Sequence, residues 1–96
     1  MRTSITGINL IKNYEKLRLK KYIDAGGHPT IGWGHKIIYG DEDYEEITEQ
    51  QAEELFQKDL KVVEDWVNKL LKVELRQHMY DAIISLVYNI GIANFQ

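Results

Sequence analysis

The pattern of apolar and polar residues along the chain begins with a short helix. Over residues 4–14 the apolar side chains recur at three-residue spacing: Ile8, Ile11 and Tyr14. This spacing places them on one face of a helix, and Thr6 precedes them as a candidate N-cap. The helix is therefore expected to end next to a carboxylate, Glu15.

A change to alternating positions predicts strands in the next stretch. Apolar and basic side chains alternate over 17–22, and the β-prone run 30–33 follows a Gly-Gly turn at 26–27. The two runs predict a hairpin or small antiparallel sheet. A third strand is expected at 36–39, before a turn at 40–43.

A long amphipathic helix is predicted over 48–73. Thr48 and Gln51 fit a capping box, in which the hydroxyl bonds to first-turn amides and the glutamine reaches back. Apolar residues then repeat at spacings of three and four: Ala52, Leu55, Phe56, Val63, Trp66, Val67 and Leu70. Val62 and Leu71 broaden this stripe beyond the seam of a coiled coil, which is the alternative. A helix about 39 Å long is too long for one small core and is expected to connect two lobes.

The last apolar stretch, 76–90, predicts a helix with more than one apolar face. One face carries Met79, Ile83, Leu86, Val87 and Ile90, and the other is partly filled by Tyr80, Ala82 and Ile84. Gly91 is expected to end the helix. Such a helix needs neighbours on several sides. The chain is therefore expected either to form a homodimer that covers this helix or to be a piece of a longer domain.

Composition limits the class of protein. The 96 residues are 44% apolar, which predicts a single domain with one modest core. The chain has no cysteine, so neither a disulfide framework nor a thiolate metal site is expected. Residues 1–14 lack the uninterrupted apolar run of a signal peptide or membrane span. No membrane insertion is expected, and export would need another protein.

The net charge of −3 is unevenly distributed. Residues 1–36 hold seven Lys and Arg against two acids, whereas residues 37–96 hold five against thirteen. A basic region around two carboxylates could attract an anionic polymer such as bacterial wall material, although solvated side chains are the simpler interpretation. No nucleic-acid motif accompanies the basic residues, so no nucleic-acid partner is expected. The acidic run 41–46 lacks calcium-ligand spacing and is predicted to be a solvated loop.

Glu15 and Asp24 are candidate catalytic carboxylates. Acids nine residues apart occur three times, at 15/24, 45/54 and 65/74, so this spacing alone carries little information. Of these three pairs, only 15/24 has a threonine six residues after its second acid, Thr30, which lies beyond a glycine-rich turn. Glycosidic bonds are usually cleaved by two carboxyl groups in different environments. The arrangement favours this chemistry over the alternative of ordinary surface acids.

No metal site is expected from the histidines. His28, His35 and His78 lie at no recognised ligand spacing. No cofactor is expected either.

At these residues the chain resembles the phage lysozymes, the muramidases used as endolysins. The resemblance rests on Glu15, Asp24 and Thr30 within the runs Tyr14–Asp24 and Thr30–His35. Later segments agree as well: Ile47-Thr48 with Gln51–Glu53, Leu55–Asp59, and Asp81–Ser85 with Tyr88–Gly91. The resemblance covers essentially the whole chain, in order.

The resemblance implies an α+β, lysozyme-like fold for residues 1–96. A small antiparallel sheet lobe would span 15–47, a long connecting helix 48–73, and a partial helical lobe 74–96. Family members continue for roughly half this length again, so the helical lobe is expected to be incomplete and the chain truncated. Met79 stands where the family often has glutamine, which we interpret as a packing change.

The resemblance also implies a function, the hydrolysis of the β-1,4 bond between N-acetylmuramic acid and N-acetylglucosamine in peptidoglycan. Glu15 would be the general acid that protonates the leaving oxygen. Asp24 would stabilise positive charge and assist the water, and the Thr30 hydroxyl would hold that water. A protein of this kind would act from the host cytoplasm and reach the wall with help from another protein.

Further site residues carry over from the same resemblance. Gly34, Tyr88 and Asn89 would contribute to substrate binding, and His35 would form a structural ion pair with Asp59. Two hypotheses compete with an active muramidase. The chain could be a fragment or remnant that folds or binds glycan without cleaving it, or a lytic transglycosylase that uses Glu15 without Asp24.

Overall fold

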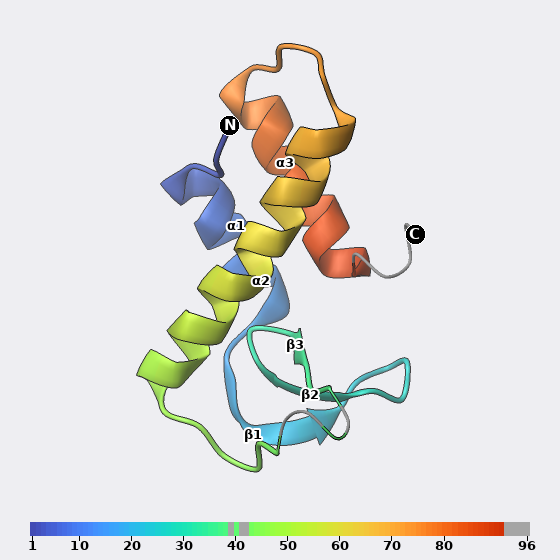
Figure 1. The fold of residues 1–96 in the computed structure, drawn as a ribbon. Helices are drawn as coiled ribbons and strands as arrows, with labels where there is room; N and C mark the ends of the chain where they lie inside the picture. The colour runs from blue at the N-terminus through green and yellow to red at the C-terminus, as the bar shows by residue number, and fades with distance from the viewer. Residues whose placement is uncertain (39, 41–42, 92–96) are drawn as a thin grey trace. The chain divides into compact units, whose positions relative to one another are not determined.

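The structure, a computed structural model, describes residues 1–38, 40 and 43–91 and contains both helices and a sheet (Figure 1). Its elements are α1 (Ile5–Glu15), β1 (Arg18–Ile23), β2 (Pro29–Gly32), β3 (His35–Lys36), α2 (Glu49–Leu70) and α3 (Gln77–Ile90). The predicted α+β class is confirmed. The contacts divide into a sheet unit, Glu15–Lys58, and a helical unit, which comprises Met1–Tyr14 and the described residues from Asp59 onward. None of the helices described is long and apolar enough to cross a membrane.

Helix α1 is capped by Ser4. The Ser4 hydroxyl accepts a hydrogen bond from Gly7 N (3.2 Å), and its carbonyl accepts one from Ile8 N (2.9 Å). The prediction that Thr6 is the cap was wrong, because the helix already begins at Ile5. Ser4 and Thr6 both carry a hydroxyl that can cap a helix, but only Ser4 stands immediately before the first turn.

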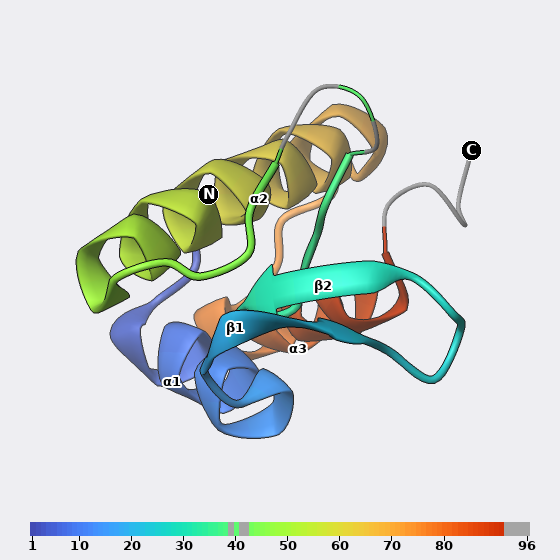
Figure 2. The same ribbon diagram turned by 90° about the horizontal axis from the view of Figure 1, so that it is seen from below.

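The sheet has three antiparallel strands in the order β1-β2-β3, which confirms the predicted hairpin. Figure 2 shows β1 and β2 side by side, joined by the loop that carries the Gly-Gly turn. Strand β3 begins one residue before the predicted start and ends at Lys36, although Ile37 N still donates to Pro29 O (2.9 Å). Tyr39, the predicted end, lies outside the described residues.

The other edge of β1 pairs with part of the acidic run. Lys20 and Glu46 form an antiparallel bridge, and the Lys21 ammonium lies 2.7 Å from the Glu45 carboxylate. Opposite charges across a strand pair favour this pairing. Glu45 and Glu46 are exposed, as predicted for a solvated loop, and the bridge to β1 is the feature that the prediction did not include. Positions 41 and 42 lie outside the described residues.

Helix α2 begins with the predicted capping box. Thr48 N donates to Gln51 Oε1 (2.8 Å), and Gln51 N donates to Thr48 Oγ1 (3.1 Å). In the sheet unit, the α2 residues Ala52 and Leu55 form a buried core with Ile31 and Ile47. The helix ends three residues before the predicted end at 73, and its 22 residues span about 33 Å.

Helix α3 is buried on one side only, not on several sides as predicted. Its buried residues are Tyr80, Asp81, Ile84, Val87 and Tyr88, whereas Met79, Leu86 and Ile90 are 47%, 55% and 42% exposed. Asp81 is one of the buried residues, and its carboxylate accepts hydrogen bonds from Ser4 N (3.0 Å), Ser4 Oγ and Gln77 Nε2 (2.9 Å). A carboxylate satisfied in this way can be buried, which hydrophobic periodicity does not anticipate. Gly91 ends the helix as predicted, with φ of 94° and its N–H bonded to Val87 O.

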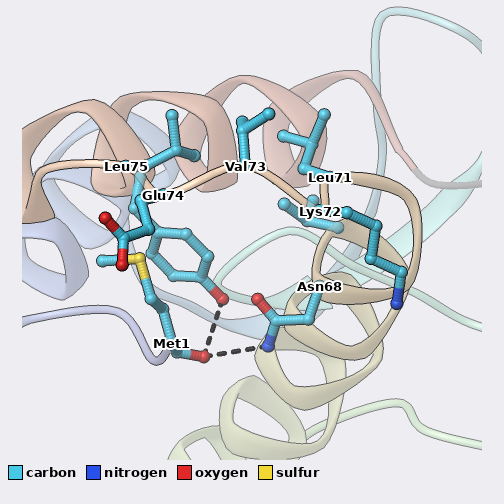
Figure 3. Close-up of a pocket in the computed structure, with 9 residues that line it drawn as sticks. Met1, Asn68, Leu71, Lys72, Val73, Glu74 and Leu75 are labelled. Carbon is cyan, nitrogen blue, oxygen red and sulfur yellow. Dashed lines mark hydrogen bonds between the residues drawn. The ribbon is translucent and has the colours of Figure 1, made fainter.

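The N-terminal segment is held within the helical unit. The Met1 carbonyl accepts hydrogen bonds from Asn68 Nδ2 (2.9 Å) and the Tyr80 hydroxyl (3.0 Å), drawn as dashed lines in Figure 3. The loop after α2 surrounds these groups and lines a cavity of about 290 Å³. None of the predicted site residues lines this cavity.

Candidate active site

Glu15 is the last residue of α1, and the backbone turns away immediately after it. Lys16 has φ of 62°, a left-handed conformation that cannot continue the helix. The Glu15 side chain is partly buried. This burial raises the pKa of Glu15, because it penalises the charged form, and the positive charge of Lys36 opposes the rise. A carboxyl in this environment retains its proton to higher pH than a free glutamate.

Gly34 makes room for the Glu15 carboxyl. A Cβ atom at this position would overlap Glu15 Oε2 and would lie 3.0 Å from its Cδ. Gly34 also has φ of 76°, which L-residues with a Cβ rarely adopt. We predicted Gly34 as a substrate-binding residue, and the structure places it against the candidate acid.

Asp24 follows β1 and lies in the hairpin loop. Its Oδ1 accepts hydrogen bonds from Gly26 N (2.9 Å) and His28 N (2.8 Å), and its Oδ2 forms an ion pair with the Lys36 ammonium. The hydrogen bond from Lys36, followed by that from His28, holds the pKa of Asp24 well below its usual range. Asp24 therefore stays ionised at any pH at which Glu15 titrates.

Thr30 lies on the middle strand, and its side chain is fully buried. Its hydroxyl donates to His28 O (2.9 Å), which also accepts a hydrogen bond from Asp24 N (2.9 Å). Thr30 is thus tied to the loop that orients Asp24. Because its hydroxyl proton is already donated, the group can interact with a water only as an acceptor.

Lys36 is the site residue that the sequence analysis missed. It lies on β3 opposite Thr30, forms an ion pair with Asp24 and acts electrostatically on Glu15. In the sequence Lys36 is one of seven basic residues in the first 36 positions. Its place beside Asp24 follows from the pairing of β3 with β2.

The remaining predicted site residues are divided between the sheet unit and the helical unit. His35 on β3 is buried, with its ring edge-on to Tyr44 at a centroid distance of 6.3 Å. Asp59 lies on α2, and the pairing of His35 with Asp59 stays a prediction. Tyr88 is buried and Asn89 is exposed near the end of α3, and their substrate contacts also stay predictions. Within the described residues, no group of three or more His, Asp or Glu side chains gathers as a metal site.

The arrangement supplies two carboxyl groups of opposite tendency. Glu15 is biased toward its protonated form and Asp24 toward its ionised form. Such a pair can donate a proton to a leaving group and stabilise positive charge in the same reaction.

Comparisons with known proteins identify the family of this chain. Residues 12–96 match the phage lysozyme family model. The endolysin of Bacillus phage PZA is 42% identical over 100 residues, which cover all of this chain and 38% of the relative. The endolysin of Acyrthosiphon pisum secondary endosymbiont phage 1 is 44% identical over 97 residues, which cover 99% of this chain and 64% of the relative.

A solved structure extends the comparison to the fold. The crystal structure of a putative phage endolysin from S. enterica superposes with a TM-score of 0.82 at 32% identity, covering 94% of this chain and 95% of the other. The chain spans about 38% and 64% of the length of the two curated relatives above. Because the family model matches residues 12–96, the chain belongs to the phage lysozyme family.

Proposed function

We propose that this protein hydrolyses bacterial peptidoglycan at the β-1,4 bond between N-acetylmuramic acid and N-acetylglucosamine. Glu15 donates its proton to the glycosidic oxygen as the bond to the sugar carbon breaks. Asp24 stabilises the positive charge that develops on the sugar and assists the attacking water. The Thr30 hydroxyl helps to hold that water, and Gly34, Tyr88 and Asn89 contribute to substrate binding.

The opposite environments of Glu15 and Asp24 carry the proposal. A general acid needs its proton near neutral pH, and partial burial of Glu15 favours that state. A carboxylate that stabilises positive charge must be ionised, and the amides of Gly26 and His28 together with Lys36 favour that state for Asp24. Two ordinary surface acids would not be separated in this way.

Membership of the phage lysozyme family supports the choice of substrate and the place of action. The matched relatives are endolysins of phages. We therefore propose that the protein is made in the host cytoplasm and reaches the wall with help from another protein.

Loss of turbidity of a peptidoglycan suspension tests the proposal. We expect the wild-type protein to clear the suspension, and Glu15→Gln and Asp24→Asn to lose roughly 10²-fold or more of that rate. Glu54→Gln is the matched control, because Glu54 belongs to another pair of acids nine residues apart and is exposed on α2. It should retain wild-type activity.

The outcomes separate the competing functions. An inactive wild-type protein that still binds peptidoglycan in a pull-down would replace the proposal with glycan binding. Full activity in Asp24→Asn with none in Glu15→Gln would favour lytic transglycosylase action, which does not need Asp24.

A further inference from the structure

We infer that Lys36 is a positioning residue of this site, which orients the Asp24 carboxylate and supplies a positive charge to the site. The inference rests on the proposed function, because it assigns Lys36 to the reaction of these two carboxyls. Lys36 is not part of the sequence pattern of two acids and a threonine from which the site was predicted.

The ion pair between Lys36 and Asp24 orients the Asp24 carboxylate. Backbone amides of Gly26 and His28 occupy Asp24 Oδ1, whereas the Lys36 ammonium occupies Oδ2. The two oxygens of the carboxylate therefore have separate partners. The amides fix the loop, and the lysine fixes the direction of the second oxygen.

The strand register explains why Lys36 reaches this position. Tyr22, Thr30 and Lys36 stand opposite one another across β1, β2 and β3. Directly opposed residues of antiparallel strands project to the same face of a sheet. Asp24 lies two residues after Tyr22, in the hairpin loop that follows β1. The Lys36 side chain, on the same face as Tyr22, therefore lies beside this loop.

The positive charge of Lys36 acts on both carboxyl groups. The titratable groups around this cluster are Glu15 at the end of α1, and Asp24 and His28 in the hairpin loop. The His28 Nδ1 lies 3.5 Å from Asp24 Oδ1. The Lys36 charge lowers the pKa of both carboxyls, that of Glu15 against the effect of burial and that of Asp24 together with the amides.

The pH range of activity follows from these effects. The proposed reaction needs Glu15 protonated and Asp24 ionised, so the pKa of Asp24 limits activity at low pH and that of Glu15 limits it at high pH. Because Lys36 lowers both, its removal should move both limits upward.

A pH profile of Lys36→Gln tests the inference. We expect the activity profile to move to higher pH by about half a unit or more, and Lys36→Arg, which keeps the charge, to restore the wild-type profile. Lys20→Gln is the matched control. It removes the same net charge, but Lys20 is exposed and pairs with Glu46 at 3.9 Å. It should leave the profile unchanged.

A carboxyl-carbon NMR titration provides a second measurement that needs no activity. The Glu15 and Asp24 midpoints should both rise in Lys36→Gln and stay at their wild-type values in Lys20→Gln. Unchanged midpoints in Lys36→Gln, or equal shifts in the two variants, would overturn the inference. An inactive wild-type protein whose midpoints still respond to Lys36→Gln would contradict the proposed function and leave the electrostatic role of Lys36 standing.

Discussion

The Glu15 carboxyl occupies a space that a neighbouring glycine leaves open. Gly34 has no Cβ, and the space that a Cβ would fill holds the Glu15 carboxyl. The Asp24 carboxylate is held in place by two backbone amides and a lysine. At the residue scale, the site therefore depends on close contacts that tolerate few substitutions.

Gly34→Ala should reduce activity much more than stability. The new methyl group would displace the Glu15 carboxyl, and a misplacement of this kind lowers activity by roughly 10²-fold. The alanine would also have to adopt φ near 76°, which destabilises the fold by about 1–2 kcal/mol. Turbidity assays and urea denaturation measure the two effects.

Gly40→Ala is the control for this change. Gly40 has φ of 87°, and a Cβ built there has no atom within 4 Å. It should show a similar loss of stability with activity retained. If both alanine variants remained fully active, the contact between Gly34 and Glu15 would have no catalytic importance.

Helices α1 and α2 begin where the sequence supplies a side-chain cap, whereas α3 begins after Arg76 with no side-chain cap hydrogen bond. Thr48 and Gln51 satisfy each other's backbone amides at the start of α2, and the Ser4 hydroxyl accepts a hydrogen bond from the Gly7 amide in α1. These are local interactions within four residues. Their effect on stability is therefore open to a direct test.

Thr48→Ala should lower the free energy of unfolding by about 1 kcal/mol, because the Gln51 amide loses its acceptor. Thr48→Ser keeps the hydroxyl and should stay close to the wild type. Urea denaturation of the three proteins measures the difference. Equal midpoints for the alanine and serine variants would show that the cap does not contribute.

Long-range hydrogen bonds hold the N-terminal segment to the helical unit. Asp81 on α3 binds Ser4, and Glu64 on α2 accepts hydrogen bonds from Thr3 N (2.6 Å) and Thr3 Oγ1 (2.7 Å). Burial raises the pKa of Asp81, but the hydrogen bonds from Ser4 and Gln77 outweigh it and hold the pKa below its ordinary value. At the scale of the whole molecule, these contacts link stability to pH.

Stability should fall as the pH falls through the folded-state pKa of Asp81. Because that pKa lies below the unfolded value, the unfolded chain binds more protons in this range, and the contribution of Asp81 is complete only above the unfolded pKa. Asp81→Asn should lower the free energy of unfolding by about 2 kcal/mol at neutral pH and flatten its dependence on acid.

Asp65→Asn is the control, because Asp65 is exposed and pairs only with Lys61 among the ion pairs described on α2. It should change stability by no more than about 0.5 kcal/mol. Chemical denaturation between pH 3 and pH 7 distinguishes the two variants. A pH dependence in Asp81→Asn as steep as that of the wild type would contradict the prediction.

We expect the chain to self-associate through the exposed side of α3. Met79, Ile83, Leu86 and Ile90 follow one another at spacings of four, three and four, the spacing of a helix-pairing seam. Leu86 is 55% exposed, and Leu86→Gln should weaken the association. Sedimentation velocity over a range of concentrations measures it.

Val62→Gln changes an equally exposed apolar residue on α2 and should leave self-association unchanged. A wild-type chain that stays monomeric at high concentration would contradict the prediction.

Local sequence predicted most elements of this protein and offered two carboxyls as candidates. Periodicity, capping residues and the glycine turn act within a few residues, so they predicted α1, the hairpin and the start of α2. Glu15, Asp24 and Thr30 could be chosen as candidates because they lie at a helix end, at a glycine-rich turn and on the strand that follows it.

Only the tertiary structure decided which groups surround those residues and which side of α3 is buried. Lys36 meets Asp24 through strand register, Gly34 meets Glu15 through the turn that follows β2, and Asp81 is buried because Ser4 satisfies its charge across 77 residues. These contacts join residues that lie far apart in the chain or on separate strands. Local pattern could not reveal them, because the free energy of burying a charge depends on partners that the fold brings to it.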